Sequence, residues 1–160
     1  LALSGLDALG RGLPQAVERG DDLEARSLAA YAAFVSGVTL SHAGLGAVHG
    51  LASPAGAACA APHAAICGRL LGPVTAANVA ALRAGRGPHG VLGAYDRAAH
   101  VLGEEIADFC RRFGLPGLGS FGLTRAMIPR VIEGATGGSM RTNPVTLTTA
   151  ELAACLEAAL

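Results

Sequence analysis

Apolar residues recur along most of the chain at spacings of three and four, which places them on one face of an α-helix. No segment alternates apolar and polar residues over the length of a strand, and no internal repeat is present. The pattern therefore predicts an all-α fold, a bundle-like domain of many helices. The predicted helices cover approximately residues 1–17, 22–40, 45–52, 63–71, 75–82, 91–102, 103–113 and 124–133, and a last helix that begins at Thr148.

Two predicted helices begin with a capping box, in which a residue before the helix and an acidic residue three positions later bond to each other's backbone. Asp21 with Glu24 opens the helix over 22–40, and Thr148 with Glu151 opens the last helix. We expect the helix over 22–40 to be buried on most sides, because most of it carries no charge. The last helix is expected to bury Leu152, Cys155, Leu156 and Ala159.

Prolines mark expected helix boundaries in the middle of the chain, because a proline inside a helix removes a hydrogen bond and clashes with the preceding turn. We expect Pro54 and Gly56 to break or bend the helix that begins at Leu45. Pro73 is expected to start a new helix after residue 71. The glycine-rich stretch over 83–90 predicts a surface loop.

The composition limits the kinds of partner. The chain has 160 residues, 51% of them hydrophobic and 15% charged, which suits one domain of closely packed helices rather than disorder. The formal net charge is zero, so no basic surface for nucleic acid or an acidic membrane is present. Residues 27–68 carry no charge, but glycine, serine and proline interrupt them without a flanking Lys/Arg bias, so we expect no membrane span.

The four cysteines, Cys59, Cys67, Cys110 and Cys155, form no C-x-x-C pair and no dense framework. This usage predicts reduced thiols and a cytoplasmic protein, and we expect no signal peptide. The first residue, Leu1, already lies in a helical pattern and is not Met. We therefore expect the chain to be one domain of a longer protein.

Three of the five histidines lie inside the uncharged stretch, where a metal, a backbone carbonyl or a substrate are the main partners available. His49 lies on a predicted helix, and His63 follows a proline at the start of the next one. The loop between them can fold His63 back towards His49, which predicts half of a mononuclear metal site. His42 lies at a helix end, where it can interact with the helix dipole, and His89 and His100 are expected at the surface.

Two other interpretations of these residues stay open. Cys59, His63 and Cys67 are spaced by four, which would line them on one face of a continuous helix. Together with His49 they would form a structural Zn²⁺ site with two sulfur and two nitrogen ligands. Pro62 argues against that continuity. In the second interpretation the histidines are core spacers of a helical structural or interaction domain.

The stretch from Gly44 to His63 resembles the metal-binding segment of the iron-containing (group III) alcohol dehydrogenases, within the dehydroquinate synthase-like superfamily. The family pattern is approximately G-L-G-x-x-H, then P-x-G, then P-H, and these positions are matched here without a gap. Residues 13–26 and 139–151 also fit. The sequence departs from the family at Ser53, where a histidine near the substrate is usual, and at Ala64 and Val145.

The resemblance implies that His49 and His63 are ligands of Fe²⁺ or Zn²⁺. It implies hydride transfer between NAD(P) and a small alcohol, aldehyde or keto acid, and maleylacetate reductases are among the related enzymes. Ser53 would place a hydroxyl near the substrate. An Asp and a His in a D-x-x-x-H motif would complete the ligands from a position upstream of Leu1.

The same resemblance implies a domain organisation. Residues 1–160 would be a single helical metal-binding domain, and the glycine-rich nucleotide-binding domain of the family would lie outside this chain. We therefore expect no activity from the chain alone. Homodimers are common in the family, so a homodimer is a further expectation.

Overall fold

The computed structural model describes all of residues 1–160 and contains only helices. The all-α prediction is confirmed. The elements are α1 (Ala2–Glu18), α2 (Leu23–Ala43), α3 (Ala47–Ala58), α4 (His63–Arg83), α5 (Val91–Leu102), α6 (Ile106–Arg112), η1 (Leu118–Phe121), η2 (Arg125–Met127), α7 (Ile128–Gly134), α8 (Gly138–Arg141) and α9 (Thr149–Ala159), where η1 and η2 are short 3₁₀ helices.

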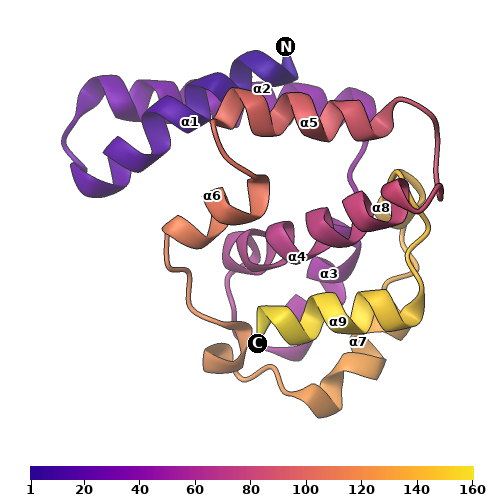
Figure 1. Cartoon of the computed structure of the whole chain (residues 1–160). Helices are drawn as coiled ribbons and strands as arrows, with labels where there is room; N and C mark the ends of the chain where they lie inside the picture. Colours follow the sequence, from indigo (N-terminus) through magenta and orange to yellow (C-terminus); the bar gives the residue numbers. More distant parts are fainter.

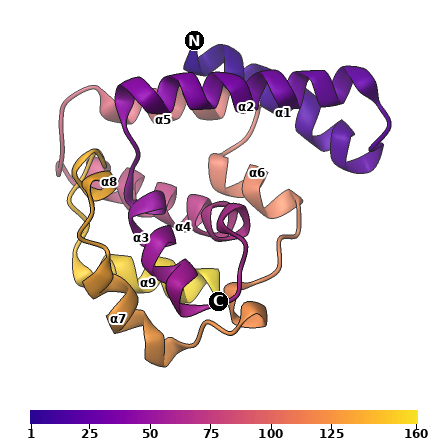
Figure 2. The same cartoon turned by 180° about the vertical axis from the view of Figure 1, so that it is seen from behind.

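The helices form two layers (Figures 1 and 2). One layer contains α1, α2 and α5, and the other contains α3, α4, α7 and α9. Helix α4 lies at the centre and contacts α3, α5, α6 and α9. The main core belongs to the second layer, where Leu51 of α3 packs in one cluster with Ile66 and Leu70 of α4. These side chains lie close in sequence to His49 and His63, so the core fixes both histidine-bearing helices.

The first layer is held together mainly by small residues. The buried positions of α1 are Gly5, Ala8 and Gly12, not its leucines. Small side chains let the backbones of α1 and α2 approach closely. The longer side chains of α1 then lie beside the contact or in solvent. The expectation that α2 is buried on most sides is wrong, since Phe34 is 71% exposed and Tyr31 is 44% exposed.

Two of the predicted helix breaks are also wrong. Pro54 lies inside α3, and Pro73 lies inside α4, which runs unbroken from His63 to Arg83. A proline keeps helical φ but costs one hydrogen bond. The flanking residues Ala55 and Val74 are buried in the main core, so packing on both sides of each proline outweighs that cost.

The predicted capping boxes have different outcomes. Thr148 and Glu151 form the expected reciprocal pair, and α9 buries its predicted apolar face. At α2 the cap is Asp22, not Asp21: its carboxylate accepts a hydrogen bond from the backbone N–H of Ala25.

Three other element boundaries are refined. The segment over 103–113 is helical only from Ile106, because Gly103 adopts a left-handed conformation (φ 75°) that ends α5. The helix predicted over 124–133 is divided between η2 and α7, and the following loop contains the short helix α8.

By length and composition, α4 is apolar enough to cross a membrane, whereas α2 and α3 would do so only as a pair that is bent by 103°. Helix α4 packs against four other helices of the domain. A core helix has the same composition, so this feature alone does not indicate a membrane segment. The absence of a membrane span stays a prediction.

The close contact between α1 and α2 gives a stability prediction. A Cβ at Gly12 would lie 2.6 Å from Leu28 Cβ and 2.8 Å from the backbone oxygen of Ala25. We expect Gly12→Ala to lower the free energy of unfolding by about 1–3 kcal/mol, measured by urea unfolding, because the backbone of α2 must move. Gly37→Ala is the matched control, since no atom lies within 4 Å of its Cβ; this change should stabilise the helix by up to about 1 kcal/mol.

The start of α9 gives a pH prediction. Hydrogen bonds from Arg86 and from the backbone of Thr148 lower the pKa of Glu151 to about 2. Because this pKa is depressed in the folded state, the stabilisation is present above the unfolded value of about 4.3 and is lost as the pH falls towards 2. In Glu151→Gln, urea unfolding should depend less on pH over that range. Glu133→Gln, an exposed site without an ion pair, should behave like the unaltered protein.

Candidate metal centre

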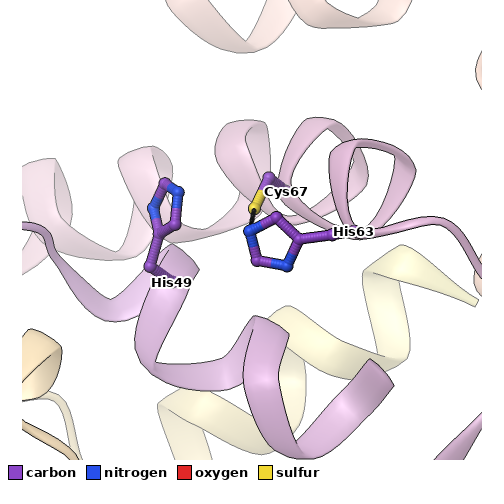
Figure 3. A group of neighbouring side chains, drawn as sticks. All are labelled: His49, His63 and Cys67. Carbon is purple, nitrogen blue, oxygen red and sulfur yellow. Dashed lines mark hydrogen bonds between the residues drawn. The ribbon is translucent and has the colours of Figure 1, made fainter. Parts of the chain in front are cut away.

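The structure brings His49 and His63 together from two helices. His49 lies in the first turn of α3, and His63 is the first residue of α4. Their ring centroids are 5.6 Å apart, with the ring planes inclined by 51°. Figure 3 shows both rings over the space between the two helices. The short connection after α3 therefore folds His63 back towards His49.

Cys67 joins the two histidines. It lies one turn after His63 on α4, and its Sγ is 3.5 Å from His63 Nε2 (Figure 3). One donor atom from each of the three residues lies within 4.8 Å of the others. Cys59 is not part of this group, because it ends α3 and the chain turns before α4 begins. The four residues of the structural zinc hypothesis are thus not all brought together.

Burial shifts the pKa of His49 and of Cys67 in this group. Partial burial, and secondarily the neighbouring His63, lower the pKa of His49. The neutral imidazole, which is the form that binds metals, is therefore favoured. Burial also raises the pKa of the Cys67 thiol, so without a metal this side chain stays protonated at neutral pH.

A cleft of ≈ 560 Å³ opens beside the group, and its lining includes both His49 and Cys67. Its volume is within the range of small-molecule sites. Tyr95 and Asn143 line it on other sides. Ser53 is exposed and lies one helical turn after His49 on α3, so the two residues share a face.

The other histidines lie apart from this group. His42 is in the last turn of α2, where its Nδ1 is 2.8 Å from the carbonyl oxygen of Val38. His89 and His100 are both exposed. None of the three belongs to the cluster of potential ligands.

The loop after α8 positions the start of α3. The side-chain oxygen of Asn143 accepts a hydrogen bond from the backbone N–H of Ala47 (3.1 Å), 96 residues earlier in the chain. The hydroxyl of Thr142 donates to the carbonyl of Leu45. Gly46, the residue before α3, has no side chain with which to cap the helix. The loop therefore supplies the cap for the helix that carries His49.

Asn143 is itself held by Asn78 of α4. The two amides bond reciprocally, with Asn78 Nδ2 donating to Asn143 Oδ1 (3.2 Å) and Asn143 Nδ2 donating to Asn78 Oδ1 (2.8 Å). Asn78 Nδ2 also donates to the hydroxyl of Tyr95 (3.1 Å). Asn78 is the one polar residue among the buried side chains. Sequence reasoning missed this pair, although an asparagine within an apolar helix was a usable signal.

Two glycines of the histidine-bearing stretch make room for this loop. Gly44 adopts a positive φ of 76°, and a Cβ there would lie 2.9 Å from Thr142 Cγ2. A Cβ at Gly46 would lie 3.0 Å from Asn143 Oδ1. The Gly-x-Gly segment and the Thr-Asn segment, far apart in sequence, thus form one structural unit.

A sequence profile described as "Fe-containing alcohol dehydrogenase family, C-terminal" matches residues 1–160. The chain belongs to this family. The match covers both the 142–143 loop and the histidine-bearing segment, and these two segments contact each other in the structure.

Individual relatives agree with this assignment. The chain is 41% identical over 63 residues to the probable alcohol dehydrogenase EutG of Escherichia coli (strain K12), covering 39% of this chain and 16% of that protein. It is 38% identical over 55 residues to the NAD-dependent methanol dehydrogenase of Bacillus methanolicus, covering 34% and 14%. The chain spans a small part of these curated relatives.

Solved structures match over almost the whole chain. An iron-containing alcohol dehydrogenase from Corynebacterium glutamicum superposes with a TM-score of 0.82 at 27% identity, covering 99% of this chain and 44% of that one. A 1,3-propanediol oxidoreductase gives a TM-score of 0.77 at the same identity and coverage. The chain therefore corresponds to less than half the length of these proteins.

The amide pair between Asn78 and Asn143 gives a stability prediction. Each buried polar group left unpaired should cost about 1–3 kcal/mol, so Asn78→Ala and Asn143→Ala should each be destabilising in urea unfolding. The double variant should lose less than the sum, with a coupling of about 0.5–3 kcal/mol.

Hydrogen exchange distinguishes the role of Asn143 as the cap of α3 from its role as the amide partner of Asn78. The amide of Ala47 should exchange faster in Asn143→Ala than in Asn78→Ala, because only the first change removes its acceptor. Additive stability losses together with unchanged exchange at Ala47 would contradict the positioning role.

Proposed function

We propose that this chain is the metal-holding domain of an oxidoreductase that transfers hydride between NAD(P) and a small alcohol, aldehyde or keto acid. The observation that carries this proposal is the placement of His49 and His63 side by side, from two helices anchored in the core, in a chain of the Fe-containing alcohol dehydrogenase family. Maleylacetate reductase-like chemistry is one form that this reaction class can take.

The donor set fits a divalent metal. Imidazole nitrogens are suitable ligands for both Fe²⁺ and Zn²⁺, and the lowered pKa of His49 favours the neutral ring that ligation requires. His49 and His63 would hold the metal, and an Asp and a His from outside this chain would complete its ligands. When bound, such a metal acts as a Lewis acid that polarises the oxygen of the alcohol or aldehyde.

The residues around the cleft would orient the substrate and limit water. Leu71 and Val74 of α4 contribute apolar side chains to the cleft, and a site with little water favours hydride transfer over side reactions. Ser53 faces outward on α3. Ser53 is not among the residues that line the cleft, so a proton relay between its hydroxyl and the substrate would be carried by bound water.

The nicotinamide cofactor would be bound mainly by a separate domain that faces this cleft. Residues 1–160 contain no β-strand, whereas dinucleotide-binding folds are built around a parallel sheet. The name of one relative, an NAD-dependent methanol dehydrogenase, supports a nicotinamide cofactor and an alcohol substrate. The four free cysteines support a cytoplasmic location, and a homodimer is part of the proposal.

The two histidines are tested by metal content. In the longest natural polypeptide that contains this chain, we expect about one equivalent of bound Fe²⁺ or Zn²⁺. The double variant His49→Ala, His63→Ala should lose that metal together with NAD(P)-dependent alcohol oxidation. Metal analysis and an absorbance assay for NAD(P)H measure both losses.

A second double variant controls for the loss of two imidazoles. His89→Ala, His100→Ala removes two exposed histidines outside the cluster and should retain both metal and activity. If the His49 and His63 variant kept its metal, those side chains would be structural, and a helical interaction domain would be the better description.

A further inference from the structure

Cys67 is the member of the cluster that the proposed function does not use. His63 and Cys67 are four residues apart on α4, so they project from the same face of that helix. Both point into the space that His49 approaches from α3 (Figure 3). The thiol therefore lies among the expected ligands, not on the far side of the helix.

The spacing of sulfur and nitrogen suits a shared metal. Zn²⁺ binds sulfur at about 2.3 Å and imidazole nitrogen at about 2.0–2.1 Å, and at a tetrahedral angle these lengths place the two donor atoms about 3.5 Å apart. In the structure, Cys67 Sγ and His63 Nε2 are 3.5 Å apart. Little rearrangement of these two side chains is needed for a metal to bridge them.

We propose that Cys67 supplies a third ligand to the metal from this domain, in place of one of the two donors expected from outside the chain, so that the domain presents two imidazoles and one thiolate. The inference rests on the proposed metal-holding role of His49 and His63. The family resemblance accounts for only those two ligands in this domain, and the sulfur ligand is an addition that comes from the geometry.

The binding step balances through loss of one proton. The Cys67 S–H bond breaks, its proton passes to solvent, and the sulfur forms a bond to the divalent ion, with no change of oxidation state. Thiolate ligands are soft and favour Zn²⁺, whereas oxygen donors suit harder ions. A sulfur ligand should therefore shift the preference of this site from Fe²⁺ towards Zn²⁺.

A weaker role for Cys67 must be distinguished from ligation. The thiol could act only as a hydrogen-bond partner that orients the ring of His63. Loss of such an outer partner typically lowers metal affinity by about 10–100-fold. Affinity alone does not separate the two roles, so the test needs a signal that comes from the metal–sulfur bond itself.

Cobalt provides that signal. The longest natural polypeptide that contains this chain is freed of metal, titrated with Co²⁺ and followed by absorption spectroscopy. We expect a near-ultraviolet charge-transfer band from sulfur to cobalt that saturates at about one equivalent. The band should be absent in Cys67→Ser. It should persist in Cys59→Ser, the matched control, because Cys59 is a free cysteine outside the cluster.

Alkylation of the unaltered protein gives a second readout that needs no variant. Bound Zn²⁺ should protect Cys67 from iodoacetamide, while Cys59 reacts equally with and without the metal. In competition experiments, the ratio of Zn²⁺ to Fe²⁺ affinity should fall in Cys67→Ser, because the soft sulfur ligand is lost.

The outcomes separate this inference from the proposed function. Co²⁺ binding that depends on His49 and His63 but shows no charge-transfer band would overturn the role of Cys67 and leave the proposed function intact. A band that persists in Cys67→Ser would also overturn it. Absence of any Co²⁺ binding would overturn both.

Discussion

The docking of the 142–143 loop onto the start of α3 is the contact on which the site depends. Asn143 caps the backbone of Ala47 and is held in turn by Asn78 of α4. One buried amide pair thus ties the tail of the chain to both helices that carry the candidate ligands. The glycines at 44 and 46 are required because any side chain there would occupy the space of this loop.

The site belongs to one of the two layers of the fold. The second layer holds the main core and the ends of α3 and α4 that face each other, so His49 and His63 project from a rigid base. The first layer contributes little large apolar burial and joins through small residues such as Gly12. Variation in the α1–α2 contact should therefore affect stability more than the arrangement of the ligands.

The potential ligands of this chain lie beside a cleft that is open on one side. These ligands are two imidazoles and a thiol, and no carboxylate is among them. Such a set binds a divalent ion most tightly when further donors approach from the open side. Under the proposed function, a facing domain would close that side and bring the hydride carrier.

The sequence by itself determined the all-α fold, the capping box at Thr148 and the pairing of His49 with His63 as candidates, because helix period, caps and uncharged surroundings are local properties. Tertiary structure decided the rest. Packing on both sides kept the helix intact through Pro73, and the return of the tail made Asn143 a cap for α3. The place of Cys67 beside His63 follows from their spacing of four on α4. The approach of His49 to both depends on how α3 and α4 cross, which no spacing along the chain encodes.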